Sequence, residues 1–67
     1  MMTIKVNNET QDISKNTTLQ ELVDFLKVKT NGIAIAINSN VVKRTDWSSK
    51  TLQQEDVVLI IKSTQGG

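Results

Sequence analysis

SKNTTLQELVDFLKVK, residues 14–29, decides the fold, because its apolar residues recur with the period of an α-helix. The apolar stripe follows the spacing i, i+3, i+4 and i+7, with Leu19, Leu22, Val23 and Leu26. Thr18 and Glu21 match a capping box, in which the hydroxyl and the carboxylate each satisfy a free N–H of the first turn. Asn31 and Gly32 both accept left-handed backbone geometry, so we expect the helix to stop there.

The segments before this helix predict a β-hairpin. TIKV, residues 3–6, alternates polar and apolar side chains like a half-buried strand, with Ile4 and Val6 facing the core. Asparagine tolerates the positive φ of tight hairpin turns, so NNE, residues 7–9, predicts the turn. TQDI, residues 10–13, would be the return strand.

The segments after the helix predict two or three more strands. IAIAIN, residues 33–38, places its isoleucines on one face and its alanines on the other, and residues 41–42 suggest a short strand. KRTDWSSK, residues 43–50, suits turns or a short helical turn, and we expect its Trp47 to pack against the core or its rim. VVLII, residues 57–61, is a β-branched closing strand after a turn near Glu55.

This order of elements predicts an α+β fold of the β-grasp (ubiquitin-like) type, with a mixed four- to five-stranded sheet packed on one main helix. A helix between two strands usually makes them a parallel pair, which we expect for the strands on either side of it. Another small α+β arrangement would show the same periodicity. Residues 1–62 would form the β-grasp domain, and residues 63–67, without an apolar anchor, a flexible diglycine tail.

The composition excludes most intrinsic chemistry. At 67 residues the chain is one small domain, near the lower limit for a self-sufficient core. The chain contains no cysteine and no histidine, which removes thiolate nucleophiles and the commonest general base and metal ligand. A net charge of +1 with interleaved acids and bases gives no footprint for nucleic acid, and the apolar runs are too short to cross a membrane. We expect a cytoplasmic protein that is monomeric when free.

The acidic residues predict surface charge. They fall in expected turns or on the polar helix face: Glu9, Asp12, Glu21, Asp24, Asp46, Glu55 and Asp56. Such carboxylates are normally solvated, and adjacent acids before a strand are common, although this last pair could also form a paired-carboxylate site. The sequence shows no catalytic triad, no Gly-rich phosphate loop and no metal-ligand spacing, so we expect no enzyme, no metal site and no bound cofactor.

KSTQGG, residues 62–67, is the remaining candidate for chemistry. Glycine has no Cβ, so Gly66 and Gly67 could thread a narrow channel and bring the terminal carboxylate close to another protein's backbone. A carboxylate must be activated before it accepts a nucleophile, for example as a mixed anhydride with a nucleotide, and a partner enzyme would have to do this. The alternative is a frayed end without function, since glycine is common in disordered tails.

From Met2 to Gly67 the chain resembles the ThiS family of thiamine-pathway sulfur carriers. The matching segments are IKVNNE, TLQELVDFL, GIAIAINSNVVKRTDW and QEDVVLIIKSTQGG. The most specific stretch is the third, where the family pattern corresponds to Ala36, Asn38, Val42, Arg44 and Trp47. Lys43 departs from the proline that is common in the family, which suggests a less rigid loop.

The resemblance implies that the protein is a recharged co-substrate. A ThiF-like adenylating enzyme would use ATP and Mg²⁺ to adenylate the carboxylate of Gly67. A persulfide derived from a cysteine desulfurase would convert it to a thiocarboxylate, and a ThiG-like thiazole synthase would take the sulfur into the thiazole ring. The reactive site would be Gly66 and Gly67.

The resemblance to ubiquitin-like folds also suggests a docking face. Val58 and Ile60 would face the helix, and the alternate residues of that strand would face outward beside the alanines of residues 33–38. A flat apolar patch usually marks a partner surface, and Arg44 is a candidate docking cation. The expected partner-binding residues are Leu59, Ile61, Ala34, Ala36 and Arg44. An ordinary sheet with scattered exposed apolar side chains, and a solubilising arginine, is the alternative.

Three other functions remain open at this point. The small subunit of molybdopterin synthase (MoaD) also combines a β-grasp with a terminal diglycine, but it is typically longer. A protein modifier would use the diglycine to form an isopeptide bond with lysine. A plain interaction module would carry the tail incidentally.

Overall fold

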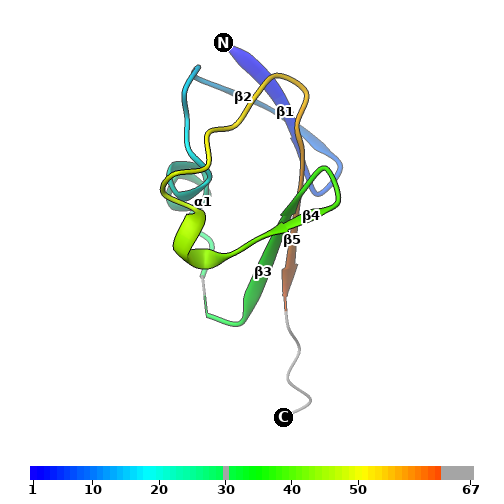
Figure 1. Ribbon diagram of the computed structural model, residues 1–67. Coiled ribbons are helices and arrows are strands. Elements are labelled where there is room, and N and C mark those ends of the chain that lie inside the picture. Colours follow the sequence, from blue (N-terminus) through cyan, green and yellow to red (C-terminus); the bar gives the residue numbers. More distant parts are fainter. Residues whose placement is uncertain (30, 63–67) are drawn as a thin grey trace.

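The computed structural model describes residues 1–29 and 31–62, so Thr30 and residues 63–67 lie outside the described part (Figure 1). The elements of this part are β1 (Met2–Val6), β2 (Glu9–Ile13), α1 (Leu19–Leu26), β3 (Ile33–Ile37), β4 (Asn40–Val42), the 3-10 helix η1 (Arg44–Asp46) and β5 (Val57–Lys62). Their strands form one mixed sheet of order β2-β1-β5-β3-β4, and α1 covers one face of it. This architecture confirms the expected α+β fold.

The last strand of the chain, β5, lies in the centre of the sheet. It pairs in parallel with β1, where Val6 lies opposite Val58. On its other side β5 pairs antiparallel with the whole of β3, as far as Lys62 opposite Ile33. The chain therefore completes its sheet only when its C-terminal strand enters between two strands that were made earlier.

The expectation that the strands flanking the helix form the parallel pair is wrong. β2 and β3 precede and follow α1, but β1 and β5 lie between them. The reason is that the segment with α1 carries the chain across the sheet and leaves the central place open, and β5 fills it. The parallel pair is therefore formed by the first and the last strand.

The start of α1 confirms the capping box. The hydroxyl of Thr18 accepts the N–H of Glu21 at 3.2 Å, and the carboxylate of Glu21 accepts the N–H of Thr18 at 2.9 Å. Each group satisfies a backbone donor that has no partner within the helix, which fixes the first turn.

The end of α1 differs from the expectation, because the helix stops at Leu26 rather than at Asn31–Gly32. Lys27 has the left-handed φ of 56°, and the N–H of Val28 reaches back to the carbonyl of Val23 at 3.4 Å. This is the hydrogen-bond pattern of a Schellman cap. The half-buried Val28 packs against the core, and this apolar contact supports the cap despite the absence of glycine at the left-handed position.

The described part has a core between α1 and the sheet. Its buried side chains are Met2, Ile4, Val6, Ile13, Leu19, Leu22, Val23, Ile35, Ile37, Trp47, Leu52 and Val58. The helix contributes its predicted stripe, although Leu26 at the end of the stripe is only half-buried. Trp47 is 2% exposed, which confirms that this ring packs inward. Phe25, in contrast, is 72% exposed.

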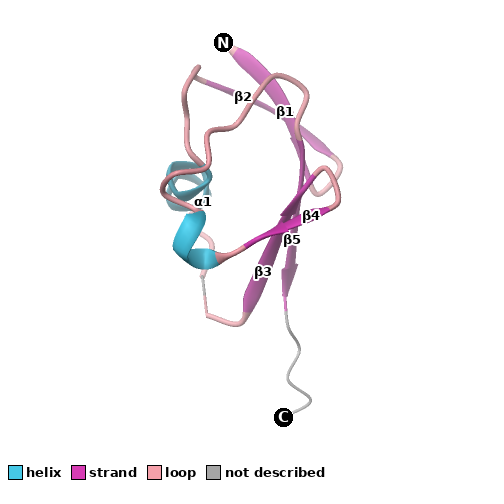
Figure 2. Cartoon of the chain, viewed as in Figure 1, coloured by secondary structure: helices cyan, strands magenta, loops and turns pink. Residues whose placement is uncertain are grey.

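The long loop between η1 and β5 closes the side of the core that the sheet leaves open (Figure 2). Leu52 is buried, and its N–H donates to the carbonyl of Thr17 at 2.8 Å. The N–H of Leu19 donates to the carbonyl of Lys50, also at 2.8 Å. These two backbone bonds fasten the loop to the segment that enters α1.

Two tight turns use asparagine, and the first is the one that the sequence predicts. Asn7 and Asn8, between β1 and β2, have φ values of 50° and 71°, and Asn38 and Ser39, between β3 and β4, have 50° and 73°. Positive φ at both central residues is the geometry that suits the right-handed twist of the joined strands. The first turn confirms the predicted hairpin.

Asp56 is not the solvated surface charge that the sequence suggested, because it is only 9% exposed. One carboxylate oxygen accepts the side-chain N–H of Asn38 at 3.0 Å, and the other accepts the backbone N–H of Gln53 at 2.8 Å. The side-chain oxygen of Asn38 in turn accepts the N–H of Val57 at 3.0 Å. This network ties the β3–β4 turn to the start of β5. The other six acids are exposed, as expected.

We expect Asp56→Ala to lower the free energy of unfolding by about 2 kcal/mol, because it removes the acceptor of the Asn38 side-chain N–H and of the Gln53 backbone N–H, two part-buried hydrogen bonds to a charged group. Urea denaturation followed by circular dichroism measures this loss. Glu9→Ala removes the same charge from an exposed position in β2 and should change the stability by less than about 0.5 kcal/mol. Equal stability of the two variants would contradict a structural role for Asp56.

Candidate functional site

β5 presents one face to the core and the other to the outside, as its alternating pattern predicts. Val58 is fully buried and Ile60 is half-buried against the core. Leu59 and Ile61 remain 40% and 50% exposed on the opposite face. The strand that leads to the tail therefore also carries two of the predicted partner-binding residues.

The cross-strand register gathers apolar side chains on this outer face. Ala34 lies opposite Ile61, Ala36 lies opposite both Leu59 and Val41, and residues directly opposite each other share a face. We define the outer-face patch as Ala34, Ala36, Val41, Val57, Leu59 and Ile61. It covers β5, β3 and β4, whereas β2 and β1 offer Thr10 and Lys5 on the same face.

Within this patch, Ala36 corrects the expectation of an exposed alanine. It faces outward but is only 6% exposed, because its small side chain lies between larger residues on both neighbouring strands. Val41 and Val57 were missed, although they are 71% and 41% exposed. Alternation along β5 would have placed Val57 outward, and the hairpin turn after β3 would have placed Val41 opposite an outward alanine.

Arg44 is not brought together with the outer-face patch. The carbon of its guanidinium group lies 5.4 Å from the centre of the Trp47 ring, within cation–π range. The indole N–H of Trp47 donates to the carbonyl of Val42 at 3.0 Å, and the N–H of Gln20 donates to the carbonyl of Trp47 at 3.0 Å. These contacts hold η1 beside α1, on the covered side of the sheet (Figure 1). The docking role of Arg44 stays a prediction.

The reactive residues expected from the sequence, Gly66 and Gly67, lie outside the described residues. The described chain ends with Lys62, the last residue of β5, opposite Ile33. Five residues follow Lys62 in the sequence. The structure thus describes the chain as far as Lys62, five positions before Gly67.

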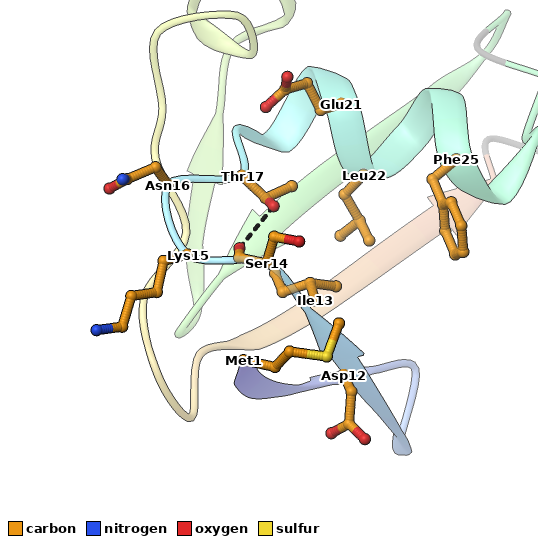
Figure 3. Close-up of a pocket in the computed structure, with 10 residues that line it drawn as sticks. All are labelled: Met1, Asp12, Ile13, Ser14, Lys15, Asn16, Thr17, Glu21, Leu22 and Phe25. Carbon is orange, nitrogen blue, oxygen red and sulfur yellow. Dashed lines mark hydrogen bonds between the residues drawn. The ribbon is translucent and has the colours of Figure 1, made fainter.

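A separate hollow lies between α1 and the end of β2 (Figure 3). Apolar side chains of Ile13, Leu22 and Phe25 line it, while the charged groups of Asp12 and Lys15 point away from them. The hydroxyl of Thr17 at its rim is occupied, since it donates to the carbonyl of Ser14 at 2.7 Å. The hollow therefore gathers apolar surface rather than groups for acid–base chemistry.

Neither a metal cluster nor a membrane span is found in the described residues. Over residues 1–29 and 31–62, no three acidic side chains lie close enough together to hold a metal ion. The helices of the same residues are too short to cross a bilayer.

Similarity to solved structures defines the class of protein. A crystal structure of a thiamine biosynthesis protein (ThiS) from Geobacter metallireducens matches with a TM-score of 0.86 at 23% identity, over 98% of this chain and 100% of that chain. An NMR solution structure of a thiamine biosynthesis protein from the same organism matches with a TM-score of 0.76 at 26% identity, over 98% of this chain and 88% of that one. The chain is thus a β-grasp protein.

Sequence similarity defines the family. The ThiS family model matches residues 4–67, which include both C-terminal glycines. The sulfur carrier protein ThiS of Escherichia coli (strain K12) is 30% identical over 66 residues, which is 98% of this chain and 100% of that protein. The chain belongs to the ThiS family, as its resemblance suggested.

We expect the two faces of β5 to respond oppositely to charge. Leu59→Asp places a carboxylate on the outer face and should cost about 1 kcal/mol of stability, whereas Val58→Asp buries a carboxylate without a partner and should prevent folding. Thermal unfolding and the dispersion of amide NMR signals distinguish the results. A folded Val58→Asp variant, or an unfolded Leu59→Asp variant, would reverse the assignment of the faces.

Proposed function

We propose that the protein is a sulfur carrier of thiamine biosynthesis, and that the carboxylate of Gly67 carries the sulfur. The observation that carries this proposal is that the family match extends to the last residue of the chain, and so includes Gly66 and Gly67. The similarity to a sulfur carrier protein over the same length supports it. The protein would act as a co-substrate of its partner enzymes and not as a catalyst.

The chemistry of a terminal carboxylate defines the steps. An oxygen of the Gly67 carboxylate attacks the α-phosphorus of ATP on a ThiF-like adenylating enzyme, and pyrophosphate leaves. The terminal sulfur of a persulfide, supplied through a cysteine desulfurase, attacks the acyl carbon and AMP leaves. A thiol reductant then cleaves the sulfur–sulfur bond and releases the thiocarboxylate. On a ThiG-like thiazole synthase this sulfur passes into the thiazole ring, and an oxygen atom from the substrate or from water replaces it on the acyl carbon, which regenerates the carboxylate.

The composition supports the proposal that partner enzymes, and not this chain, catalyse these steps. The chain has no histidine and no cysteine, so it offers neither an imidazole base nor a thiolate for any of these steps. The diglycine presents no side chain to a narrow active site, so the backbone can approach the nucleotide closely. The folded domain then serves as the surface by which the enzymes recognise the carrier.

The outer-face patch is the surface that we assign to the adenylating enzyme. It combines four partly or largely exposed apolar side chains, Val41, Val57, Leu59 and Ile61, on one face of the sheet. Contiguous apolar surface of this kind favours a protein partner. Ile61 lies immediately before the residue at which β5 ends, so docking here would bring the enzyme close to the tail.

Deletion of Gly67 should abolish thiocarboxylate formation, because the carboxylate then ends one residue short of its place in the adenylating site. The chain is incubated with ATP, the adenylating enzyme and a sulfur donor, and its intact mass is measured. The full-length chain should exchange one oxygen for sulfur, while Lys15→Ala, a control remote from the tail in sequence, should do so equally well. A shortened chain with the full mass change would refute the role of Gly67. Conjugates to lysine that survive reducing gels would favour a protein modifier instead.

Leu59→Asp and Ile61→Asp should raise the KM for adenylation about tenfold or more, since each puts a charge into a desolvated apolar contact. Pyrophosphate exchange measures the KM. Thr10→Asp adds the same charge to the polar half of the same face and is the matched control. An unchanged KM in folded patch variants would exclude the outer-face patch as the docking site.

A further inference from the structure

The C-terminal half of β5 has one edge that is not paired with any strand of the described chain. β1 follows β5 only as far as Val6 opposite Val58, and the chain then turns away at Asn7. On the opposite edge, β3 continues to Lys62. Figure 1 shows β5 running on toward the C-terminus beyond the hairpin of β1 and β2.

The side chain of Asn7 takes the place of β1 for one further step. Its oxygen accepts the N–H of Ile60 at 2.8 Å, and its N–H group donates to the carbonyl of Ile60 at 3.4 Å. The carbonyl of Val58 accepts the N–H of Asn7 at 2.9 Å on the same edge. Because alternate residues of a strand direct their backbone groups to the same edge, those of Lys62 point there too. They have no partner within residues 1–29 and 31–62.

A groove lies beside this edge and carries positive charge. Leu26 and Val28, from the end of α1, and Ile60 give it an apolar lining. Its charged lining residues are Lys27, Lys29, Lys62 and Glu9, so the lining contains three basic side chains and one acidic side chain. The groove also includes Asn7, the residue that closes the edge at Ile60.

We propose that this edge and groove dock an extended, acidic segment of a partner protein, which adds to the sheet beside Lys62, just past the place that Asn7 occupies. Strand addition is favoured because the N–H and C=O of Lys62, which have no partner in the described part of the chain, are a donor and an acceptor that a peptide backbone can pair together. Acidic side chains of the segment would lie among Lys27, Lys29 and Lys62, and its alternate apolar side chains would cover the lining of the groove. A nucleic-acid backbone would match the charge but supplies no regular row of donors.

The identity of the partner rests on the proposed function. Lys62 is followed directly by the tail, so a segment paired here would hold the first part of the tail beside the enzyme that modifies Gly67. The groove and the outer-face patch lie on opposite sides of β5, because Ile60 and Leu59 point to opposite faces. One enzyme segment can therefore occupy the groove while the sheet face stays available.

The test is an NMR titration of the full chain with a blocked peptide of alternating glutamate and valine. We expect the amide signals of Ile60, Lys62 and Lys29 to shift. Lys62→Pro, which removes the free N–H, should bind about fivefold more weakly than Lys62→Ala, which removes only the side-chain charge. Lys29→Gln should weaken binding about threefold at low salt, and a peptide with lysine in place of glutamate should not bind.

The inference is overturned by any of three results. These are no shift at millimolar peptide, shifts confined to the outer-face patch, or equal affinity of Lys62→Pro and Lys62→Ala. The Lys62 variants must keep the wild-type dispersion of amide signals, which is expected because the Lys62 N–H points away from β3. The titration uses no ATP and no enzyme, so its result is independent of the intact-mass assay. The peptide can fail to bind while the thiocarboxylate still forms, and the peptide can bind while no thiocarboxylate forms. The two proposals are therefore tested separately.

Discussion

The fold depends on the insertion of β5 between β1 and β3. β1 and β3 do not pair with each other, so the two halves of the sheet are joined only through β5. Two asparagines bind the backbone of this strand, one at its first residue and one at Ile60. Asn38, held by Asp56, accepts the N–H at the start of β5, and Asn7 pairs with the backbone of Ile60 where β1 has ended. Side-chain amides thus supply ladder bonds that the neighbouring strands cannot supply.

A central C-terminal strand also decides how the chain leaves the domain. A terminal edge strand would end at the rim of the sheet, whereas β5 ends at Lys62 beside β3, beyond the last pairing with β1. Its two faces and its free edge therefore all lie near the exit at Lys62. In this small domain one strand serves three purposes. β5 contributes side chains to the core, forms the centre of the sheet and carries part of the outer-face patch.

Much of this fold is predictable because local sequence encodes it. The helix, its cap at Thr18 and the hairpin turn at Asn7–Asn8 each depend on a few neighbouring residues, and all are observed. The end of the helix was not predicted, because a left-handed lysine depends on the packing of Val28 against a distant core. Local sequence patterns predict glycine at a left-handed cap position, and they contain no information on the contact of Val28 with the core.

The remaining errors have the same origin in non-local contacts. Asp56 precedes a strand like an ordinary turn acid, and only the approach of Asn38 from the β3–β4 turn makes it a buried acceptor. Ala36 has the outward orientation that alternation predicts, but its exposure is set by the neighbours in β4 and β5. The outer-face patch likewise depends on non-local strand pairing. Val41 and Val57 are recognised as part of it only when the strand order is known.

The length of the tail connects these surfaces to the proposed chemistry. In the proposed function, five residues after Lys62 extend at most about 18 Å, so an adenylating enzyme would have to hold the Gly67 carboxylate within that distance of the end of β5. Docking on a remote surface would leave the active site out of reach, whereas the outer-face patch begins at Ile61 and the groove includes Lys62. Contacts at these positions also reduce the volume that the tail must search, which raises its effective concentration at the active site. If Gly67 carries the sulfur as proposed, partner enzymes would have to recognise the carrier close to Lys62, and both the outer-face patch and the groove lie there.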